Sequence, residues 1–219
     1  MSPPAEIPCE APRLSEQERS RLLGIARLAI ATAVRGGGPP HVPDPGGRLS
    51  ERAGVFVSLH KDGLLRGCIG QVVHPRPLYR GVLEAATSAA LRDPRFPPLG
   101  KDELSSVEIE ISVLSPLLEV DSSEAESQIV IGRHGLMVSK GHSRGLLLPQ
   151  VAVRFGWQPR EFLEETCVKA GLPRQAWLGG ACLEVFTAEV FAERELPGSF
   201  RPPTAIQPDR PRKFPSGRK

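Results

Sequence analysis

The sequence has few of the residues that mark disulfide-rich, metal-binding or membrane proteins. Among its 219 residues are four cysteines, and none forms a CxxC pair or lies near a histidine at zinc-finger spacing. No apolar run reaches the ~18 residues of a membrane-spanning helix. The first residues also lack the basic and apolar regions of a secretory signal. We therefore expect free thiols, no metal or other cofactor, no membrane association and a cytoplasmic location.

A strong charge of one sign is also missing, because the formal net charge is only +3. The excess gathers near the end of the chain, at Arg201, Arg210, Arg212, Lys213, Arg218 and Lys219. No basic patch with interleaved aromatic residues accompanies this tail, and aromatic residues make up only 5% of the chain. We therefore do not expect a nucleic-acid partner. Both chain ends, residues 1–13 and the Pro- and Arg-rich residues 196–219, are expected to be disordered.

The chain does contain clear helix and strand patterns. Ser15 and Glu18 form a capping-box pattern ahead of a helical apolar stripe, and Pro77 is placed to open a second helix that runs to about Arg92. Residues 55–60 and 64–71 alternate as two strands joined by an Asp62-Gly63 turn. Residues 107–113 alternate as another strand.

The second half of the sequence continues the mixture of hairpins and helices. Residues 135–138 and 145–148 predict a second hairpin, residues 159–170 a helix, and residues 183–191 one last strand. Residues 121–126 are expected to form an acidic loop. Hairpins mixed with separated helices indicate an α+β fold with an antiparallel or mixed sheet.

Four sequence blocks, in this order, give the chain a family resemblance. They are GVFVSLHKDGLLRGCIG at 54–70, DPRFPPL at 93–99, VEIEISVLSP at 107–116, and GLLLPQVAVRFGW at 145–157 followed by FLEETCVKAGLP at 162–173. Together they resemble the AMMECR-type domain of the AmmeMemoRadiSam system protein A family. The resemblance covers residues 14–192.

The resemblance implies an α+β protein with a larger and a smaller lobe, and functional residues near LRGCIG. It also implies two partners, a Memo-like protein and a radical-SAM protein. The CxxxCxxC triplet of radical-SAM enzymes is missing here, so that chemistry would belong to the partner. The resemblance supplies no reaction for this chain.

The local chemistry of LRGCIG allows two interpretations. Strand alternation would put Arg66 and Cys68 on one face, where the guanidinium would favour a nucleophilic thiolate or grip an anionic ligand. Gly67 and Gly70 would let a ligand or another backbone approach closely. Alternatively, Cys68 is a small buried residue of a central strand and Arg66 is paired with a carboxylate.

Other residues are candidate partners of this motif. Glu110 joins Cys68 as a candidate catalytic residue. Alternatively, Glu108 and Glu110 neutralise nearby arginines. The candidate ligand-binding residues are Arg66, Gly67, Gly70, Asp93, Arg95 and Gln150. His60 and His74 flank the motif without a secure place beside Cys68. His134 and His142 are expected to be exposed.

Two functions follow from these observations. The chain is either a component of the AmmeMemoRadiSam system with a small-molecule or peptide cleft at LRGCIG, or a non-enzymatic adaptor in which LRGCIG is purely structural. The sequence does not decide whether the protein is an enzyme. Replacement of Cys68 by serine would separate a nucleophile from the other roles.

Overall fold

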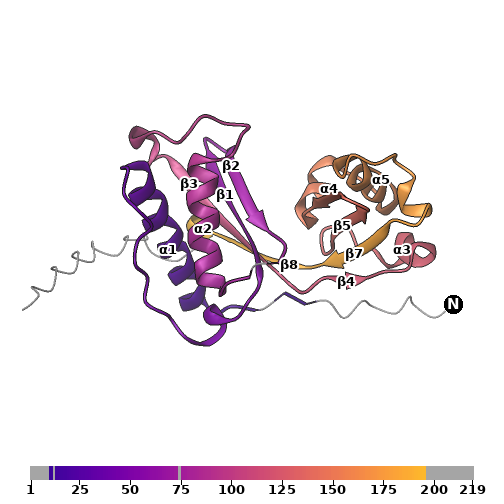
Figure 1. Cartoon of the computed structure of the whole chain (residues 1–219), viewed down its shortest axis with the longest axis horizontal. Coiled ribbons are helices and arrows are strands. Elements are labelled where there is room, and N and C mark those ends of the chain that lie inside the picture. The colour runs from indigo at the N-terminus through magenta and orange to yellow at the C-terminus, as the bar shows by residue number, and fades with distance from the viewer. Residues whose placement is uncertain (1–9, 12, 74, 196–219) are drawn as a thin grey trace, which may run out of the picture.

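The computed structural model describes residues 10–11, 13–73 and 75–195, which form two lobes (Figure 1). The predictions of disorder at the chain ends fall mainly outside these residues. Each lobe contains one four-stranded antiparallel sheet and its own hydrophobic core. The α+β prediction with a larger and a smaller lobe is confirmed.

The larger lobe has two long helices on one side of its sheet. Its elements are α1 (Glu16–Val34), β1 (Gly54–Lys61), β2 (Leu64–Gln71), α2 (Leu78–Leu91), β3 (Val107–Leu114) and β8 (Ala188–Ala192). The strand order is β2-β1-β3-β8, so β2 is an edge strand. Figure 1 shows α1 and α2 side by side against this sheet. Short 3-10 helices occupy Gly47–Ser50, Lys101–Glu103 and Glu193–Glu195.

Strand alternation decides which face of the larger sheet is covered. Val57, Leu59 and Ile109 are fully buried against the helices, and each such side chain contributes about 1.5–3 kcal/mol through its transfer from water. Ser58 and Glu110 follow the opposite phase and lie on the other face of the sheet. This second face carries the polar side chains of the candidate site.

The smaller lobe surrounds a sheet of order β4-β7-β5-β6 with three helices. Its elements are β4 (Leu118–Glu119), α3 (Ser122–Gln128), β5 (Gly135–Lys140), β6 (Ser143–Leu147), α4 (Pro149–Phe155), α5 (Pro159–Lys169) and β7 (Cys182–Phe186), with a 3-10 helix at Ala176–Leu178. Phe162, Leu163 and Val185 are fully buried in its core.

Two chain segments connect the lobes, one between β3 and β4 and one between β7 and β8. The Ser115 amide donates to the Thr187 carbonyl over 3.0 Å, and the Thr187 amide donates to Ser115 Oγ over 3.0 Å. Beside them, Leu114 and Phe186 form a small apolar cluster. The expected single strand over residues 183–191 is therefore wrong, because the chain leaves one sheet at Phe186 and enters the other at Ala188.

Several local predictions are confirmed by the structure. Ser15 and Glu18 form a capping box at α1, and the β1–β2 turn has positive φ at Asp62 (53°) and Gly63 (76°), as a two-residue hairpin loop requires. The predicted acidic loop is wrong, since residues 122–128 form α3 with Asp121 as its N-cap. His134 is also buried, contrary to expectation.

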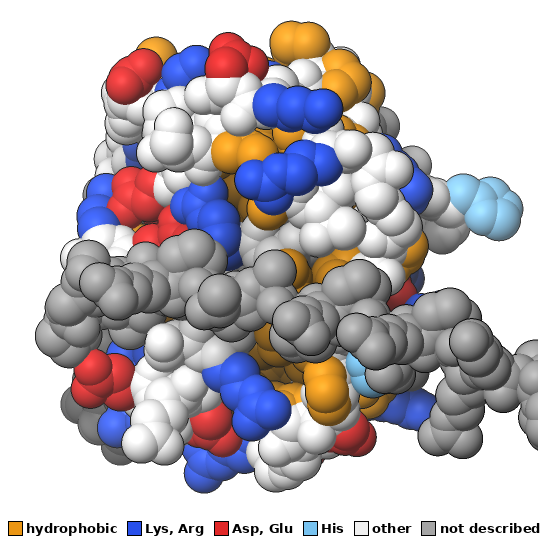
Figure 2. Space-filling model, turned by 90° about the vertical axis from the view of Figure 1, so that its left-hand side faces the viewer, with side chains coloured by type: hydrophobic (Ala, Val, Ile, Leu, Met, Phe, Trp, Pro, Cys, Tyr) orange, Lys and Arg blue, Asp and Glu red, His pale blue; other side chains and the backbone are white. Residues whose placement is uncertain are grey.

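Helix hydrophobicity and surface charge can be described for residues 10–11, 13–73 and 75–195. No helix there is long and apolar enough to cross a membrane. Figure 2, which views the molecule from the left of Figure 1, shows basic and acidic side chains interspersed, without a broad patch of one sign among the coloured residues.

Candidate functional site

Arg66 does not share a face with Cys68, because a β-bulge interrupts the alternation of β2. Leu59 of β1 pairs with Gly67, but the next residue, His60, pairs with Leu65. Arg66 is thus the extra residue of the bulge and leaves the register that Cys68 keeps. The expected pairing of this guanidinium with the thiol is wrong.

Arg66 is instead held by a carboxylate and by backbone carbonyls. Its Nε and Nη2 donate to the two carboxylate oxygens of Glu103 over 3.1 and 2.9 Å, and its Nη1 donates to the Pro97 carbonyl over 2.9 Å. Lys61 binds the same carboxylate over 3.1 Å. These partners lower the pKa of Glu103 to about 2. The Arg66 guanidinium is therefore already bound by groups of the protein itself.

Cys68 lies in a row of polar side chains that crosses three strands. The Ser58 hydroxyl donates to Cys68 Sγ over 3.3 Å, and Ser58 pairs in turn with Glu110 of β3. The structure therefore brings Cys68 and Glu110 onto one face of the sheet, with Ser58 between their strands. It joins neither of them to Gln150, which is exposed at the start of α4 in the smaller lobe.

The surroundings of Cys68 favour the thiol rather than the thiolate. Burial raises its pKa, and the charges of Asp93 and Glu110 act in the same direction, outweighing the Ser58 hydrogen bond and the Arg95 charge. His60 faces Leu65 and Glu108 in the register, and His74 lies outside the described residues. This environment is the opposite of the electropositive one that a cysteine nucleophile needs.

Asp93 and Arg95 bind the backbone of Cys68 at the open edge of β2. The Cys68 amide donates to Asp93 Oδ2 over 2.8 Å, and its carbonyl accepts from Arg95 Nη2 over 3.2 Å. The two side chains are also paired with each other, and the Arg95 bonds lower the pKa of Asp93 to about 2. They take the place of a neighbouring strand, which is a structural role that their position before and after Pro94 did not suggest.

Gly67 and Gly70 are required by close packing. A Cβ on Gly67 would lie 2.3 Å from the Ala89 carbonyl oxygen of α2, and a Cβ on Gly70 would lie 2.2 Å from the Val55 carbonyl oxygen. Gly67 therefore allows the end of α2 to approach the strand, and Gly70 allows the close approach of β1. Both glycines have a backbone function that is independent of any ligand.

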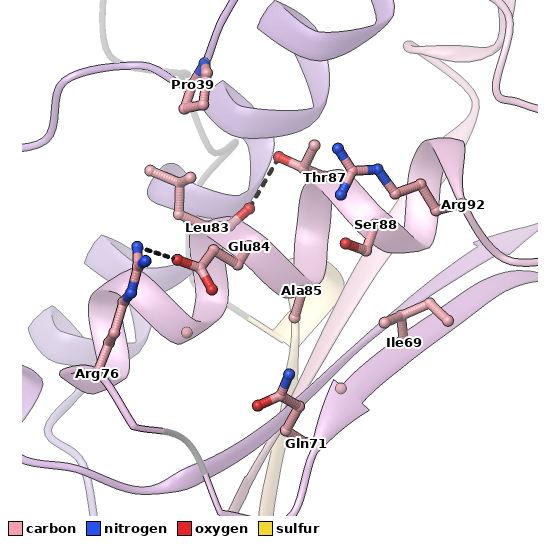
Figure 3. A pocket seen from close by; sticks show the side chains of 12 residues that line it. Pro39, Ile69, Gln71, Arg76, Leu83, Glu84, Ala85, Thr87, Ser88 and Arg92 are labelled. Carbon is pink, nitrogen blue, oxygen red and sulfur yellow. Dashed lines mark hydrogen bonds and ion pairs between the residues drawn. The ribbon is translucent and has the colours of Figure 1, made fainter.

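A cavity of about 400 Å³ runs along the downstream half of β2 beside α2 (Figure 3). Ile69, Gly70 and Gln71 form its strand side. Its helix side includes Gly81, Glu84, Ala85, Thr87, Ser88 and Arg92. Figure 3 shows Arg92 and Ser88 at one end and the Arg76–Glu84 ion pair at the other. Of the predicted ligand-binding residues, only Gly70 lines this cavity, and the helix residues were missed because α2 read as an ordinary amphipathic helix.

A second cavity, of about 660 Å³, lies where the lobes meet. It is lined by residues of both lobes, including Gly54, Leu114 and Glu184, and its wall is mainly apolar. None of the predicted site residues lines it. Among the described residues, no group of three or more His, Cys, Asp or Glu side chains is placed to hold a metal ion.

Fold and site together define a two-lobed α+β protein with a cavity beside the edge strand of its larger sheet. The AMMECR1 family model matches residues 23–191, so this chain belongs to the AMMECR1 family.

Three proteins similar to this chain have names that give no activity. The chain is similar to Protein MK0488 of Methanopyrus kandleri, with 45% identity over 86% of this chain and 95% of that protein. It is 49% identical to a protein of Methanothermobacter thermautotrophicus over 82% of this chain and 96% of that protein. The crystal structure of the uncharacterized protein PH0010 from Pyrococcus horikoshii is similar, with TM-score 0.74 and 42% identity over 81% of this chain and 92% of that one.

Proposed function

We propose that this chain is a ligand-binding component of an AmmeMemoRadiSam system, acting with a Memo-like protein and a radical-SAM protein in the cytoplasm. Its ligand is a small molecule or a peptide, and the binding site is the cavity along the LRGCIG strand. The cavity carries this proposal, since it places Ile69 and Gly70 of the motif beside polar side chains of α2. Its volume is in the range of known ligand sites.

The geometry favours binding over nucleophilic catalysis by Cys68. The thiol has a raised pKa, and Arg66 is occupied by Glu103. Glu110 raises the pKa of the thiol further instead of activating it. The first four residues of the motif are thus structural, while its last two, Ile69 and Gly70, line the cavity together with the following Gln71. Any reaction on the ligand would then take place with a partner protein.

Filling the cavity tests this function. Ser88 lines the cavity on α2, and Ser88→Phe would occupy part of it. A strain from which the gene has been deleted should recover its metabolite profile with the wild-type chain but not with Ser88→Phe. The matched control is Gln17→Phe, which places the same aromatic ring at an exposed position of α1.

The proposal also predicts an association that can be measured directly. The tagged full chain, coexpressed with Memo-like and radical-SAM proteins from one genome, should copurify with at least one of them. A folded Ser88→Phe that restores the metabolite profile fully would contradict the cavity as the site. Thermal denaturation of each variant shows whether it is folded.

A non-enzymatic adaptor is the second candidate, and the surface of α4 favours it. The rings of Phe155 and Trp157 stack with centroids 4.9 Å apart, and Phe155 and Val153 remain 61% and 58% exposed. Exposed apolar groups of this kind are typical of partner surfaces. If Phe155→Ser abolishes copurification and function while Ser88→Phe leaves both intact, the adaptor role is favoured.

A further inference from the structure

We propose that the cavity between β2 and α2 binds the carboxyl-terminal end of an extended peptide, which pairs with the open edge of β2 and places its terminal carboxylate at Arg92. The inference rests on the proposed function and names the ligand class of its site. Four features of the cavity carry it: an open strand edge, a closed end, an uncommitted guanidinium and a helix face of small residues.

The strand edge along the cavity offers backbone hydrogen-bonding groups. The amide and carbonyl of Cys68 both point away from β1, since they bind Asp93 and Arg95. In an antiparallel ladder the residue two positions further has the same orientation, so the register turns the amide and carbonyl of Gly70 away from β1, and Gly70 lines the cavity. Within the described part of the chain, no side chain covers them as Asp93 and Arg95 cover Cys68. An added strand would find one donor and one acceptor there.

The upstream end of this edge is closed, which sets the direction of the peptide. Asp93 and Arg95 occupy the edge at Cys68, and α2 touches β2 at Gly67. A peptide entering beside Gln71 therefore has to stop near Cys68. Its chain would run antiparallel to β2, which is the more stable pairing, with its last residue at the closed end.

A positive charge lies at that closed end. Arg92 directly precedes Asp93 and lines the cavity, and its side chain is exposed. Arg66 and Arg95 are each held by a carboxylate, whereas no carboxylate of the described residues pairs with Arg92. A guanidinium in this state is suited to bind a carboxylate with two parallel hydrogen bonds. The terminal carboxylate of the peptide would provide the missing partner.

The helix side of the cavity leaves space for side chains of the peptide. Gly81, Ala85 and Ser88 follow one another at steps of four and three residues, so they share one face of α2, and Arg92 is the C-cap residue that follows this helix. The first three are small, and Ile69 and Leu83 add apolar surface. This surface suits a short, aliphatic peptide end next to the charged terminus.

The test uses the full chain and two pools of randomised octapeptides, immobilised through their amino termini. One pool carries free terminal carboxylates, and the other carries terminal amides. We expect the protein to bind to peptides of the acid pool only. A binder resynthesised as the amide, or with its backbone nitrogens facing Gly70 methylated, should lose at least tenfold in affinity. On binding, the Gly70 amide should exchange its hydrogen more slowly.

Two variants locate the carboxylate. Arg92→Met should lower the affinity for the acid peptide about tenfold, which corresponds to about 1.4 kcal/mol of binding free energy. Arg21→Met, at an exposed arginine of α1, should leave the affinity unchanged. Equal retention of the two pools, no retention of either, or unaltered affinity of Arg92→Met would overturn the proposal. An amidated peptide that binds as tightly through an internal Asp or Glu would also overturn it.

The outcomes separate this inference from the proposed function. If Ser88→Phe fails to restore the metabolite profile but the wild-type protein binds no acid peptide, the cavity serves another ligand and the peptide inference fails. If an acid peptide binds at Arg92 but Ser88→Phe restores the profile fully, the peptide site exists and the proposed function fails.

Discussion

The two lobes pack a helix against an edge strand in the same way. Each contains a hairpin whose second strand, β2 or β6, lies at the edge of its sheet. A Cβ on Gly67 would lie 2.3 Å from the Ala89 carbonyl oxygen, and a Cβ on Gly145 would lie 2.3 Å from the Ala170 amide nitrogen. In both lobes, one glycine allows the end of a helix to contact the strand.

The lobes differ in how they hold their buried polar groups. Around β2, the carboxylates of Asp93 and Glu103 are paired with arginines, which keeps the pKa of each at about 2. The smaller lobe buries His134, whose Nδ1 accepts from the Val130 amide over 3.2 Å and whose pKa is lowered by burial. Both lobes thus use a glycine to bring a helix end against the edge strand, but one lobe holds charged pairs and the other a neutral imidazole. Acid should destabilise the lobes in different pH ranges.

The largest effect is expected from the two packing glycines. Gly67→Ala and Gly145→Ala should each lower the free energy of unfolding by about 3 kcal/mol, because the added methyl group meets helix backbone that cannot move alone. Gly38→Ala is the control, since nothing lies within 4 Å of its added Cβ. Urea denaturation measures the three variants. If either packing variant behaves like Gly38→Ala, the shared device is contradicted for that lobe.

A smaller loss is expected from breaking the charged cluster at the bulge. Glu103→Gln should lower the free energy of unfolding by about 2 kcal/mol. It leaves Arg66 without its charged partner while the Arg66 side chain stays largely buried. Asp102→Asn, at the exposed neighbouring position, should change stability by less than about 0.5 kcal/mol. Urea unfolding at pH 7 gives both values. Equal stability of the two variants would mean that this pair contributes nothing to the lobe.

The contrast in pH dependence is the next smaller effect. Protonation of His134 favours the unfolded state, so its contribution is complete above pH 6.5 and is lost as pH falls below 6.5 towards its lower folded pKa. Asp93 and Glu103 lose their contributions to stability only between about pH 4.5 and their folded pKa values of about 2.

Tryptophan fluorescence can follow the smaller lobe separately. The only two tryptophans of the chain are both in this lobe, since Trp177 is buried in its core and Trp157 packs against that core. Its unfolding should become easier between pH 6.5 and 5, and His134→Gln should remove that dependence. His142→Gln, at an exposed hairpin turn, should keep it. A fluorescence transition that is unchanged down to pH 5 in the wild type would contradict the role of His134.

The smallest effect is expected at Cys68. Cys68→Ser should change the free energy of unfolding by less than about 1 kcal/mol, since a hydroxyl can keep the contact with Ser58. It should also restore the metabolite profile of the deletion strain. At neutral pH, iodoacetamide should alkylate Cys68 more slowly than the exposed Cys182. A folded Cys68→Ser that fails to restore the profile would bring a reacting thiol back into consideration.

The sequence predicted elements well where neighbouring residues determine them. The capping box of α1 and the turn at Asp62-Gly63 depend on contacts within four residues, and both are confirmed. The seven-residue helix α3 was missed because it has a single buried position, Ala125, and therefore no visible periodicity. The break at Thr187 was missed because residues 183–191 alternate as one strand although they serve two sheets.

The candidate site shows the same division. The sequence by itself determined the family blocks, the β1–β2 hairpin and the placement of Cys68 and Glu110 on strands. Only the tertiary structure decided that Arg66 leaves the face of Cys68, that it binds a carboxylate 37 residues away, and that Asp93 and Arg95 close the edge of β2. Local alternation cannot report a bulge or a distant partner, because the bulge appears only in the pairing of β2 with β1 and Glu103 lies in the segment after α2.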